Sequence, residues 1–338
     1  MNRKILFLGI VAATLALCAI VAAVYVFPHE PDRPVVYIVY DTDKGDLSYT
    51  DSTYAGLFSA QEAMRFDKKE FVSTDPAEIG PAIRDAPAGK RPGLVITLGY
   101  AQTGMTEQLA REYPGVRFLA IDQSGIGSGN VRAYEITSYG DSYLAGVLAA
   151  SATKTGRIGI IPGTQAALLD TFRAGYRDGA RAVRPTIAVD EAYVRDNSTA
   201  GFYDPDRAAE IARGMYGNGA DVIYMAAGYS NTGIVRVAKE APGRYVIGTD
   251  SDQTSLGPGV VLASAVKRLD RVVYQGIGEY LGGSFSGGGT VAGLSGGATG
   301  LVFNPRFENY NGTVRSWEAK AEEEEARYLA TRAAAAQG

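Results

Sequence analysis

The chain has 338 residues, with 33 Lys and Arg against 37 Asp and Glu, so its formal net charge is −4. This balance gives no electrostatic reason to expect a nucleic-acid partner. One cysteine and one histidine argue against a disulfide framework, a Cys-x-x-Cys motif, His-ligated metals and catalytic triads. Together with 21 Tyr and 42 Gly, this composition is typical of a binding protein, and we expect no enzymatic activity, metal or cofactor.

The N-terminal segment predicts export from the cytoplasm. Residues 5–27 carry no charge and are long enough to cross a bilayer as a helix, while Arg3 and Lys4 favour an orientation with the following chain outside. Three interpretations stay open: an uncleaved signal anchor, a lipoprotein signal with lipidation at Cys18, and a cleaved signal peptide. A lipobox requires a small residue directly before its cysteine, but the residue before Cys18 is not small. All three place the rest of the chain on the extracytoplasmic face of the plasma membrane, beyond a linker at residues 28–34.

Downstream of the linker, short apolar runs alternate with amphipathic stretches. We predict strands at residues 35–40, 93–98, 117–121, 157–161, 192–195, 221–226 and 245–247, with helices over 52–65 and 106–113 among others. Buried strands with interposed helices indicate an α/β fold with parallel sheets covered on both faces. These strands are more than one small sheet usually holds, and the length fits two domains, so we expect two lobes.

Four of the apolar runs end at residues suited to ligand binding. These residues are Asp41, Asp122, Tyr229 (after Gly228) and Asp250. Because the carboxyl ends of parallel strands meet at one edge of a sheet, we expect these side chains to converge on one cleft. A lone Asp in such a place also fits a helix N-cap or a turn, but four in corresponding positions favour a cleft.

The C-terminal part is rich first in glycine and then in charge. Residues 282–300 lack the order of a phosphate-binding loop, so we interpret them as turns between short strands. Residues 315–335 predict a helix with a solvated face that carries the acidic run 322–325, and Trp317 is expected to dock this helix on the body.

Several short blocks, taken in order, resemble a known family. They are Asp41–Tyr49, Phe118–Asp122, Ser142–Val147, Phe172–Tyr176, Gly219–Ile223, Ile247–Gln253 and Val261–Lys267. The set resembles the basic membrane protein family of substrate-binding lipoproteins, which includes bacterial purine nucleoside receptors of ABC transporters, over nearly all of residues 35–305. The chain departs from the family pattern at Gly45 (usually Asn), Tyr49 (usually Phe), Gly140 (commonly Glu) and Tyr229 (usually Gly), and these departures concern the ligand more than the fold.

The resemblance implies a type I periplasmic-binding-protein-like fold with two hinged lobes. We expect lobe 1 to hold residues 35–125 and about 250–285, and lobe 2 to hold 126–249 and about 286–338. The chain is then expected to cross between the lobes near residues 123–130, 243–249 and 285–300. Closure of the lobes over the ligand produces the form that a permease recognises.

The resemblance also implies the function and the roles of individual residues. We expect an ABC importer's substrate-binding protein that binds a nucleoside, with a purine expected, acts as a monomer and meets the membrane through its N-terminus. By the resemblance Tyr49 is expected to stack on the base, and the strand-end position of Tyr229 makes it a second candidate for this role. Asp250 is expected to accept hydrogen bonds from the sugar diol, and Lys267 to donate one to a sugar oxygen.

Three further acidic residues complete the expected site. Asp41 and Asp122 would read the edge of the base, and Asp46 would support the first loop. Alternatives remain a receptor for sugars or other small ligands, a sensor on the same scaffold, and a nucleoside hydrolase that holds Ca²⁺ through clustered Asp residues. Lys44 interrupts the acidic residues of the first loop, which disfavours the hydrolase.

Overall fold

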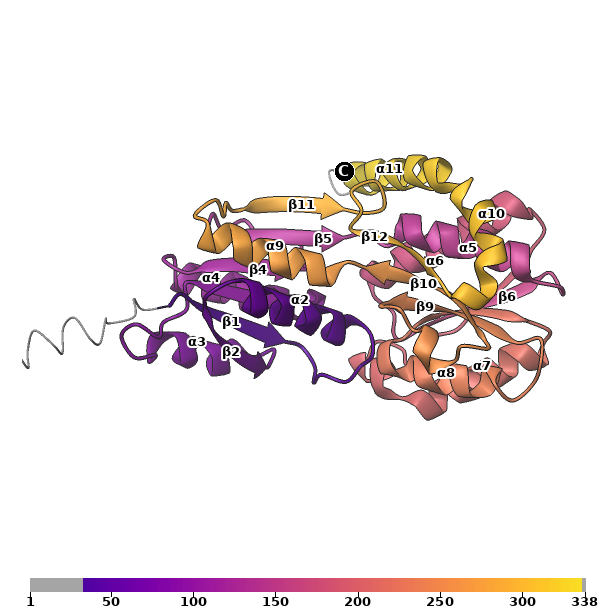
Figure 1. Cartoon of the computed structure of the whole chain (residues 1–338), viewed down its shortest axis with the longest axis horizontal. Coiled ribbons are helices and arrows are strands. Elements are labelled where there is room, and N and C mark those ends of the chain that lie inside the picture. The colour runs from indigo at the N-terminus through magenta and orange to yellow at the C-terminus, as the bar shows by residue number, and fades with distance from the viewer. Residues whose placement is uncertain (1–32, 336–338) are drawn as a thin grey trace, which may run out of the picture.

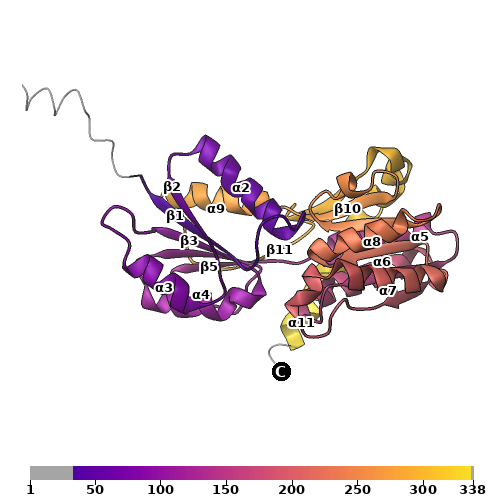
Figure 2. The ribbon, with the colours of Figure 1, turned by 90° about the horizontal axis from the view of Figure 1, so that it is seen from below.

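The computed structural model describes residues 33–335, which form two α/β lobes lying end to end (Figure 1; Figure 2). The predicted signal or anchor segment, Cys18 and nearly all of the linker lie outside the described residues. Among the described residues, no helix is long and apolar enough to cross a membrane.

Lobe 1 is built on a six-stranded parallel sheet with the order β11-β5-β4-β3-β1-β2. Its strands are β1 (Val35–Tyr40), β2 (Asp67–Val72), β3 (Leu94–Leu98), β4 (Arg117–Ile121), β5 (Val131–Ile136) and β11 (Gly288–Ala292), and its helices are α2 (Tyr49–Ala63), α3 (Pro76–Arg84), α4 (Thr103–Glu112) and α9 (Leu269–Leu281). Successive side chains of β1 point to opposite faces. Ile38 packs under α2 and α9, whereas Val39 packs against α3 and α4, so helices cover both faces.

Lobe 2 repeats this design with the strand order β12-β10-β9-β8-β6-β7, in which only the β10–β12 pair is antiparallel. Its strands are β6 (Arg157–Pro162), β7 (Ala188–Glu191), β8 (Val222–Ala226), β9 (Tyr245–Asp250), β10 (Val261–Lys267) and β12 (Thr299–Phe303), and its helices are α5 (Tyr139–Ala152), α6 (Ala167–Val183), α7 (Pro205–Gly217), α8 (Asn231–Ala238), α10 (Asn311–Arg315) and α11 (Glu318–Ala335). Helices α5 and α6 cover one face, and α7 and α8 cover the other. The predicted α/β fold with two lobes is confirmed.

Five short 3₁₀ turns complete the described elements. They are η1 (Tyr100–Gln102), η2 (Thr199–Tyr203), η3 (Gly228–Ser230), η4 (Thr254–Leu256) and η5 (Pro305–Tyr310). The predicted strands at 35–40 and 117–121 match β1 and β4, but the strand predicted at 192–195 is wrong, because β7 ends at Glu191. The chain there still runs beside β6, with the Ala192 and Val194 N–H groups donating to the Ile160 and Pro162 carbonyls at 3.3 and 3.0 Å.

Within residues 33–335, three segments link the two sheets. They are residues 137–138 between β5 and α5, Arg268 between β10 and α9, and residues 293–298 between β11 and β12. Only the third falls in a predicted crossing. The predicted boundaries at residues 125 and 249 are wrong because β5 adds to the sheet of lobe 1 and β10 to that of lobe 2, and β11 likewise belongs to lobe 1. Trp317 packs on the core of lobe 2, as predicted.

Candidate functional site

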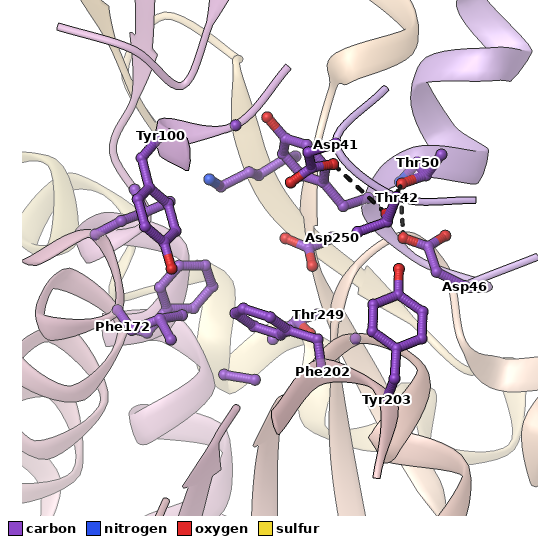
Figure 3. Close-up of a pocket in the computed structure, with 17 residues that line it drawn as sticks. Asp41, Thr42, Asp46, Thr50, Tyr100, Phe172, Phe202, Tyr203, Thr249 and Asp250 are labelled. Carbon is purple, nitrogen blue, oxygen red and sulfur yellow. Dashed lines mark hydrogen bonds between the residues drawn. The ribbon is translucent and has the colours of Figure 1, made fainter. Parts of the chain in front are cut away.

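A cavity lies between the lobes, where the carboxyl ends of both sheets face each other (Figure 3). The space open to the centres of water molecules in it is about 100 Å³. Lobe 1 lines it with Asp41, Thr42, Asp46, Tyr49, Thr50, Gly99 and Tyr100, and lobe 2 with Leu168, Leu169, Phe172, Phe202, Tyr203, Ala226, Gly228, Thr249, Asp250 and Lys267. The predicted convergence of strand ends on one cleft therefore holds for Asp41 and Asp250.

Aromatic rings from both lobes form much of the cavity wall. Of the aromatic lining residues, only Tyr49 was predicted from the sequence; Tyr100, Phe172, Phe202 and Tyr203 were missed. Figure 3 shows Tyr100 and Phe172 on one side and Phe202 and Tyr203 facing the acidic residues. Phe172 lies in the Phe172–Tyr176 block and Tyr100 follows a strand end, so both carried a signal. Phe202 and Tyr203 belong to η2, which follows no strand directly.

Asp250 ends β9 with a positive φ of 64°. Its side chain is partly buried, and its carboxylate accepts a hydrogen bond from the Ser48 hydroxyl of lobe 1 at 2.9 Å. Burial raises the pKa of Asp250 to about 6, although nearby Lys267 and the Ser48 hydroxyl oppose the shift. A partly buried carboxylate that lines a cavity and has free acceptor capacity is suited to hydrogen-bond donors on a ligand.

Asp41 follows β1 and lines the cavity opposite the aromatic residues of lobe 2. Burial also raises the pKa of Asp41 to about 6. Gly99 leaves room for its carboxylate, because a Cβ at Gly99 would lie 2.8 Å from Asp41 Oδ2, and the φ of Gly99 is +81°. A larger residue than Gly99 after β3 would therefore displace the Asp41 carboxylate.

Asp122 and Lys267 form an ion pair between the lobes. Lys267 Nζ donates to Asp122 Oδ2 at 2.6 Å, while Asp122 Oδ1 accepts the Ile136 N–H at 2.9 Å. Burial opposes the charge on Lys267, but Asp122 and Asp250 outweigh it and raise the pKa of Lys267. Asp122 is not among the lining residues, and its carboxylate is engaged by Lys267 and the backbone. Its expected role in reading the edge of the base stays a prediction.

Asp46 holds the start of α2. One of its oxygens accepts the Ser48 and Asp51 N–H groups at 3.0 and 3.1 Å, and the other accepts the Thr50 N–H at 2.8 Å. These are N–H groups that a helix start leaves without an internal partner. Both oxygens of Asp46 are therefore committed to the loop, the supporting position expected from the sequence.

Tyr229 does not line the cavity. It is 39% exposed, although the preceding Gly228 is a lining residue. The 3₁₀ turn η3 begins at Gly228 with a φ of +56°, which presents this glycine to the cavity and turns the next side chain away. The structure therefore does not bring Tyr229 to the cavity wall, and its stacking role stays a prediction.

The lobes also touch directly beside the cavity. The Ser251 hydroxyl and the Gln253 amide, both from lobe 2, donate to the Leu47 carbonyl at 2.8 and 3.3 Å. The Tyr203 hydroxyl interacts with Thr42 of lobe 1. Burial raises the pKa of Tyr203 to about 12 and outweighs the opposing effect of Thr42. The structure is thus a closed arrangement. Within residues 33–335, no group of three His, Cys, Asp or Glu side chains is placed to hold a metal ion.

Two sheets joined by three crossings around a cavity define a fold class, the type I periplasmic-binding-protein-like fold. A solute-binding protein of an ABC transporter system from Aeropyrum pernix K1 has this fold with a TM-score of 0.73 at 23% identity, covering 87% of this chain and 86% of that one. A solute-binding protein from Conexibacter woesei has a TM-score of 0.67 at 20% identity, covering 86% and 97%. These similarities confirm the predicted fold.

Residues 34–327 match the Bmp family, described as "ABC transporter substrate-binding protein PnrA-like". The chain belongs to this family, which confirms the resemblance seen in the sequence. Basic membrane protein D of Borreliella burgdorferi is 31% identical over 288 residues, 83% of this chain and 82% of that protein. The "ABC transporter nucleoside-binding protein BmpA" of Lactococcus lactis is 34% identical over 211 residues, 58% and 59% of the two chains. Substrate-binding proteins of ABC transporters work on the extracytoplasmic side of the membrane.

Proposed function

We propose that this protein binds a nucleoside, with a purine expected, in the cavity between its lobes and delivers it unchanged to an ABC permease. The observation that carries the proposal is the composition of the cavity, which combines aromatic rings from both lobes with carboxylates. A nucleoside offers a flat base for the rings and a sugar diol for a carboxylate. The Lactococcus lactis relative, named as nucleoside-binding, supports the same ligand class.

The proposed roles follow from the position of each group. Tyr49 and Phe172 flank Lys267, whose Nζ lies 5.8 and 5.5 Å from the two ring centroids, and these rings would contact the base. Asp250 would accept the diol hydroxyls and Asp41 would accept donors on the base edge. Lys267 would donate to a sugar oxygen, oriented by Asp122 from behind.

The charge of the cavity adds a specificity. Apart from tyrosine hydroxyl groups, the ionisable groups that line the cavity are three carboxylates and one ammonium. The ammonium is already paired with Asp122. Because a phosphate would meet this excess of negative charge in a poorly solvated space, the proposed ligand is a nucleoside and not its 5′-monophosphate.

The finer location is part of the proposal. The uncharged run at residues 5–27 would tether the binding domain at the outer face of the plasma membrane, as an anchor or through a lipid on Cys18. The binding domain would act as a monomer. Fractionation of cells that make the native chain and a Cys18→Ala variant distinguishes the two forms of attachment, since only the lipid form depends on the thiol.

Replacement of Asp250 tests the assignment of the site. We expect Asp250→Ala to lower nucleoside affinity by well over tenfold in calorimetry, because the diol loses its charged acceptor. The matched control is Asp252→Ala, since Asp252 lies two residues away, is exposed and caps a turn through the Thr254 N–H. Unchanged affinity in Asp250→Ala with a native melting curve would contradict the assignment.

A further inference from the structure

The acidic run of α11 was expected to be solvated throughout. In the structure it is not uniformly solvated. Glu323 and Glu324 pair with Lys320 and Arg327 on the surface. Glu325, in contrast, is only 3% exposed. A buried carboxylate is costly unless hydrogen bonds replace its water, so the environment of Glu325 requires an explanation.

Glu325 binds the backbone of one interlobe crossing and the backbone of the helix start that directly follows another. Its Oε1 accepts the N–H of Gly140, in the first turn of α5 directly after the crossing at 137–138, at 2.9 Å. Its Oε2 accepts the N–H of Leu294, inside the crossing at 293–298, also at 2.9 Å. Charge-assisted bonds of this kind are the stronger class. One side chain therefore ties together two segments at the junction of the lobes.

Two glycines make room for this carboxylate. A Cβ at Gly140 would lie 2.8 Å from Glu325 Oε1, and a Cβ at Gly293 would clash with Glu325 Oε2. Neither glycine has a positive φ, so space and not backbone conformation explains both residues. The pocket for the carboxylate is thus built from the same two segments that supply its hydrogen bonds.

Helix α11 also touches both sides of the junction. Arg332 Nη1 donates to Glu135 on β5 of lobe 1 at 3.2 Å. The Tyr328 ring stacks on Tyr139 at the start of α5 in lobe 2, with 4.5 Å between centroids. Figures 1 and 2 both show α11 beside the place where the lobes meet. The helix is therefore placed to influence the angle between the lobes.

We propose that Glu325 is a positioning residue that holds the crossings in the closed arrangement and so sets ligand affinity without touching the ligand. A receptor whose binding-competent form is less populated binds proportionally more weakly, and hinge residues far from a site act in this way. The affinity part rests on the proposed function, whereas the effect on lobe geometry does not depend on any ligand.

The distance between the lobes in the ligand-free protein tests this proposal. The full-length chain in detergent, in a Cys18→Ser background, would carry spin labels at Gln108→Cys on α4 and Glu210→Cys on α7, both exposed. We expect Glu325→Ala to broaden the distance distribution from electron paramagnetic resonance and move it from the native value toward a longer distance. Glu322→Ala, an exposed neighbour in the same run, should leave it unchanged.

Affinity and stability give the second readout. We expect Glu325→Ala to raise the nucleoside Kd by roughly 3- to 10-fold through the smaller closed population. Glu325→Gln retains an acceptor oxygen for one N–H and should shift the distance less, in the same direction; it decides the question if the alanine variant fails to fold. A lower melting temperature with a native distance distribution overturns the proposal, because Glu325 would then only stabilise the fold. Absence of nucleoside binding by the native chain would contradict the proposed function but leave the distance test intact.

Discussion

At the scale of single residues, the site depends on carboxylates kept in poorly solvated positions. Asp41 and Asp250 each have a pKa raised by burial from 3.8 to about 6. At mildly acidic pH each of these two carboxyl groups is therefore partly protonated. The Lys267 ammonium is paired with Asp122 at 2.6 Å. Protonation therefore changes what the cavity can accept from a ligand.

Nucleoside affinity should fall as the pH drops through about 6. Above that pH Asp41 and Asp250 are ionised acceptors, and below it their protonated forms lose the charge-assisted bonds. Calorimetry at pH 5 and pH 7.5 measures the effect, and we expect a several-fold weaker Kd at pH 5. An affinity that is independent of pH would contradict the proposed roles of both residues.

Stability should respond in the opposite direction. A folded-state pKa above the unfolded value means that ionisation of Asp250 costs stability at pH values above about 6, and that this cost disappears as the pH falls toward 4. Asp250→Asn removes the titration, so its gain in unfolding free energy over the native chain should grow as the pH rises from about 4 to about 6 and stay constant above that. Urea denaturation of both proteins at several pH values measures this difference.

The residues show where sequence reasoning succeeds and where it stops. Asp41 and Asp250 were predicted because both directly follow buried strands. Tyr229 follows a strand too, but the φ of +56° at Gly228 turns it outward, and a single sequence does not display such a turn. Asp122 was placed at the correct strand end, but its partner Lys267 lies 145 positions away. Pairings of that range depend on how the lobes dock.

At the scale of elements, close helix packing stabilises lobe 2. Helices α5 and α6 approach until backbone touches backbone: a Cβ at Gly146 would clash with the Tyr176 carbonyl, and one at Gly179 with the Tyr143 carbonyl. Both glycines lie inside helices, where glycine costs about 0.5–1 kcal/mol relative to alanine. The close approach explains why they are retained.

Gly146→Ala should therefore destabilise the protein. We expect a loss of about 1–3 kcal/mol of unfolding free energy, since a methyl group is forced into packed backbone. Gly214→Ala is the matched control, because Gly214 is also inside a helix, α7, but a Cβ there meets nothing within 4 Å. It should be neutral or stabilise by up to about 1 kcal/mol. Urea denaturation checks both variants, and equal effects would contradict this packing account.

Six of the twelve strands in residues 33–335 match predicted strands, but the lobe to which some segments belong was not predicted. Continuous apolar runs such as residues 35–40 and 117–121 indicate buried strands directly. The run 131–136 alternates buried and partly exposed residues and lies at the expected boundary, so it was assigned to the wrong lobe. Strand β11 is mostly exposed and rich in glycine, which leaves its sequence without a strand pattern.

At the scale of the whole molecule, ligand binding depends on closure of the two lobes. The cavity exists only where the two lobes face each other, and contacts such as Ser48 with Asp250 and Ser251 with Leu47 join the same lobes. Two lobes were predictable from length and strand number. The crossings were not, because their positions depend on the pairing of β5, β10 and β11. The buried Glu325 was hidden for a related reason, since its partners come from two distant segments.

The central claim is that the interlobe cavity holds a nucleoside, and native mass spectrometry of the purified full-length chain tests it most directly. The proposal predicts a 1:1 complex, either retained through purification or formed on addition of a purine nucleoside, whose ligand fragments into a nucleobase and a sugar. The corresponding 5′-monophosphate should give no complex under the same conditions, because the cavity carries excess negative charge. A retained sugar or other ligand without a base, or no complex with any nucleoside, would contradict the claim.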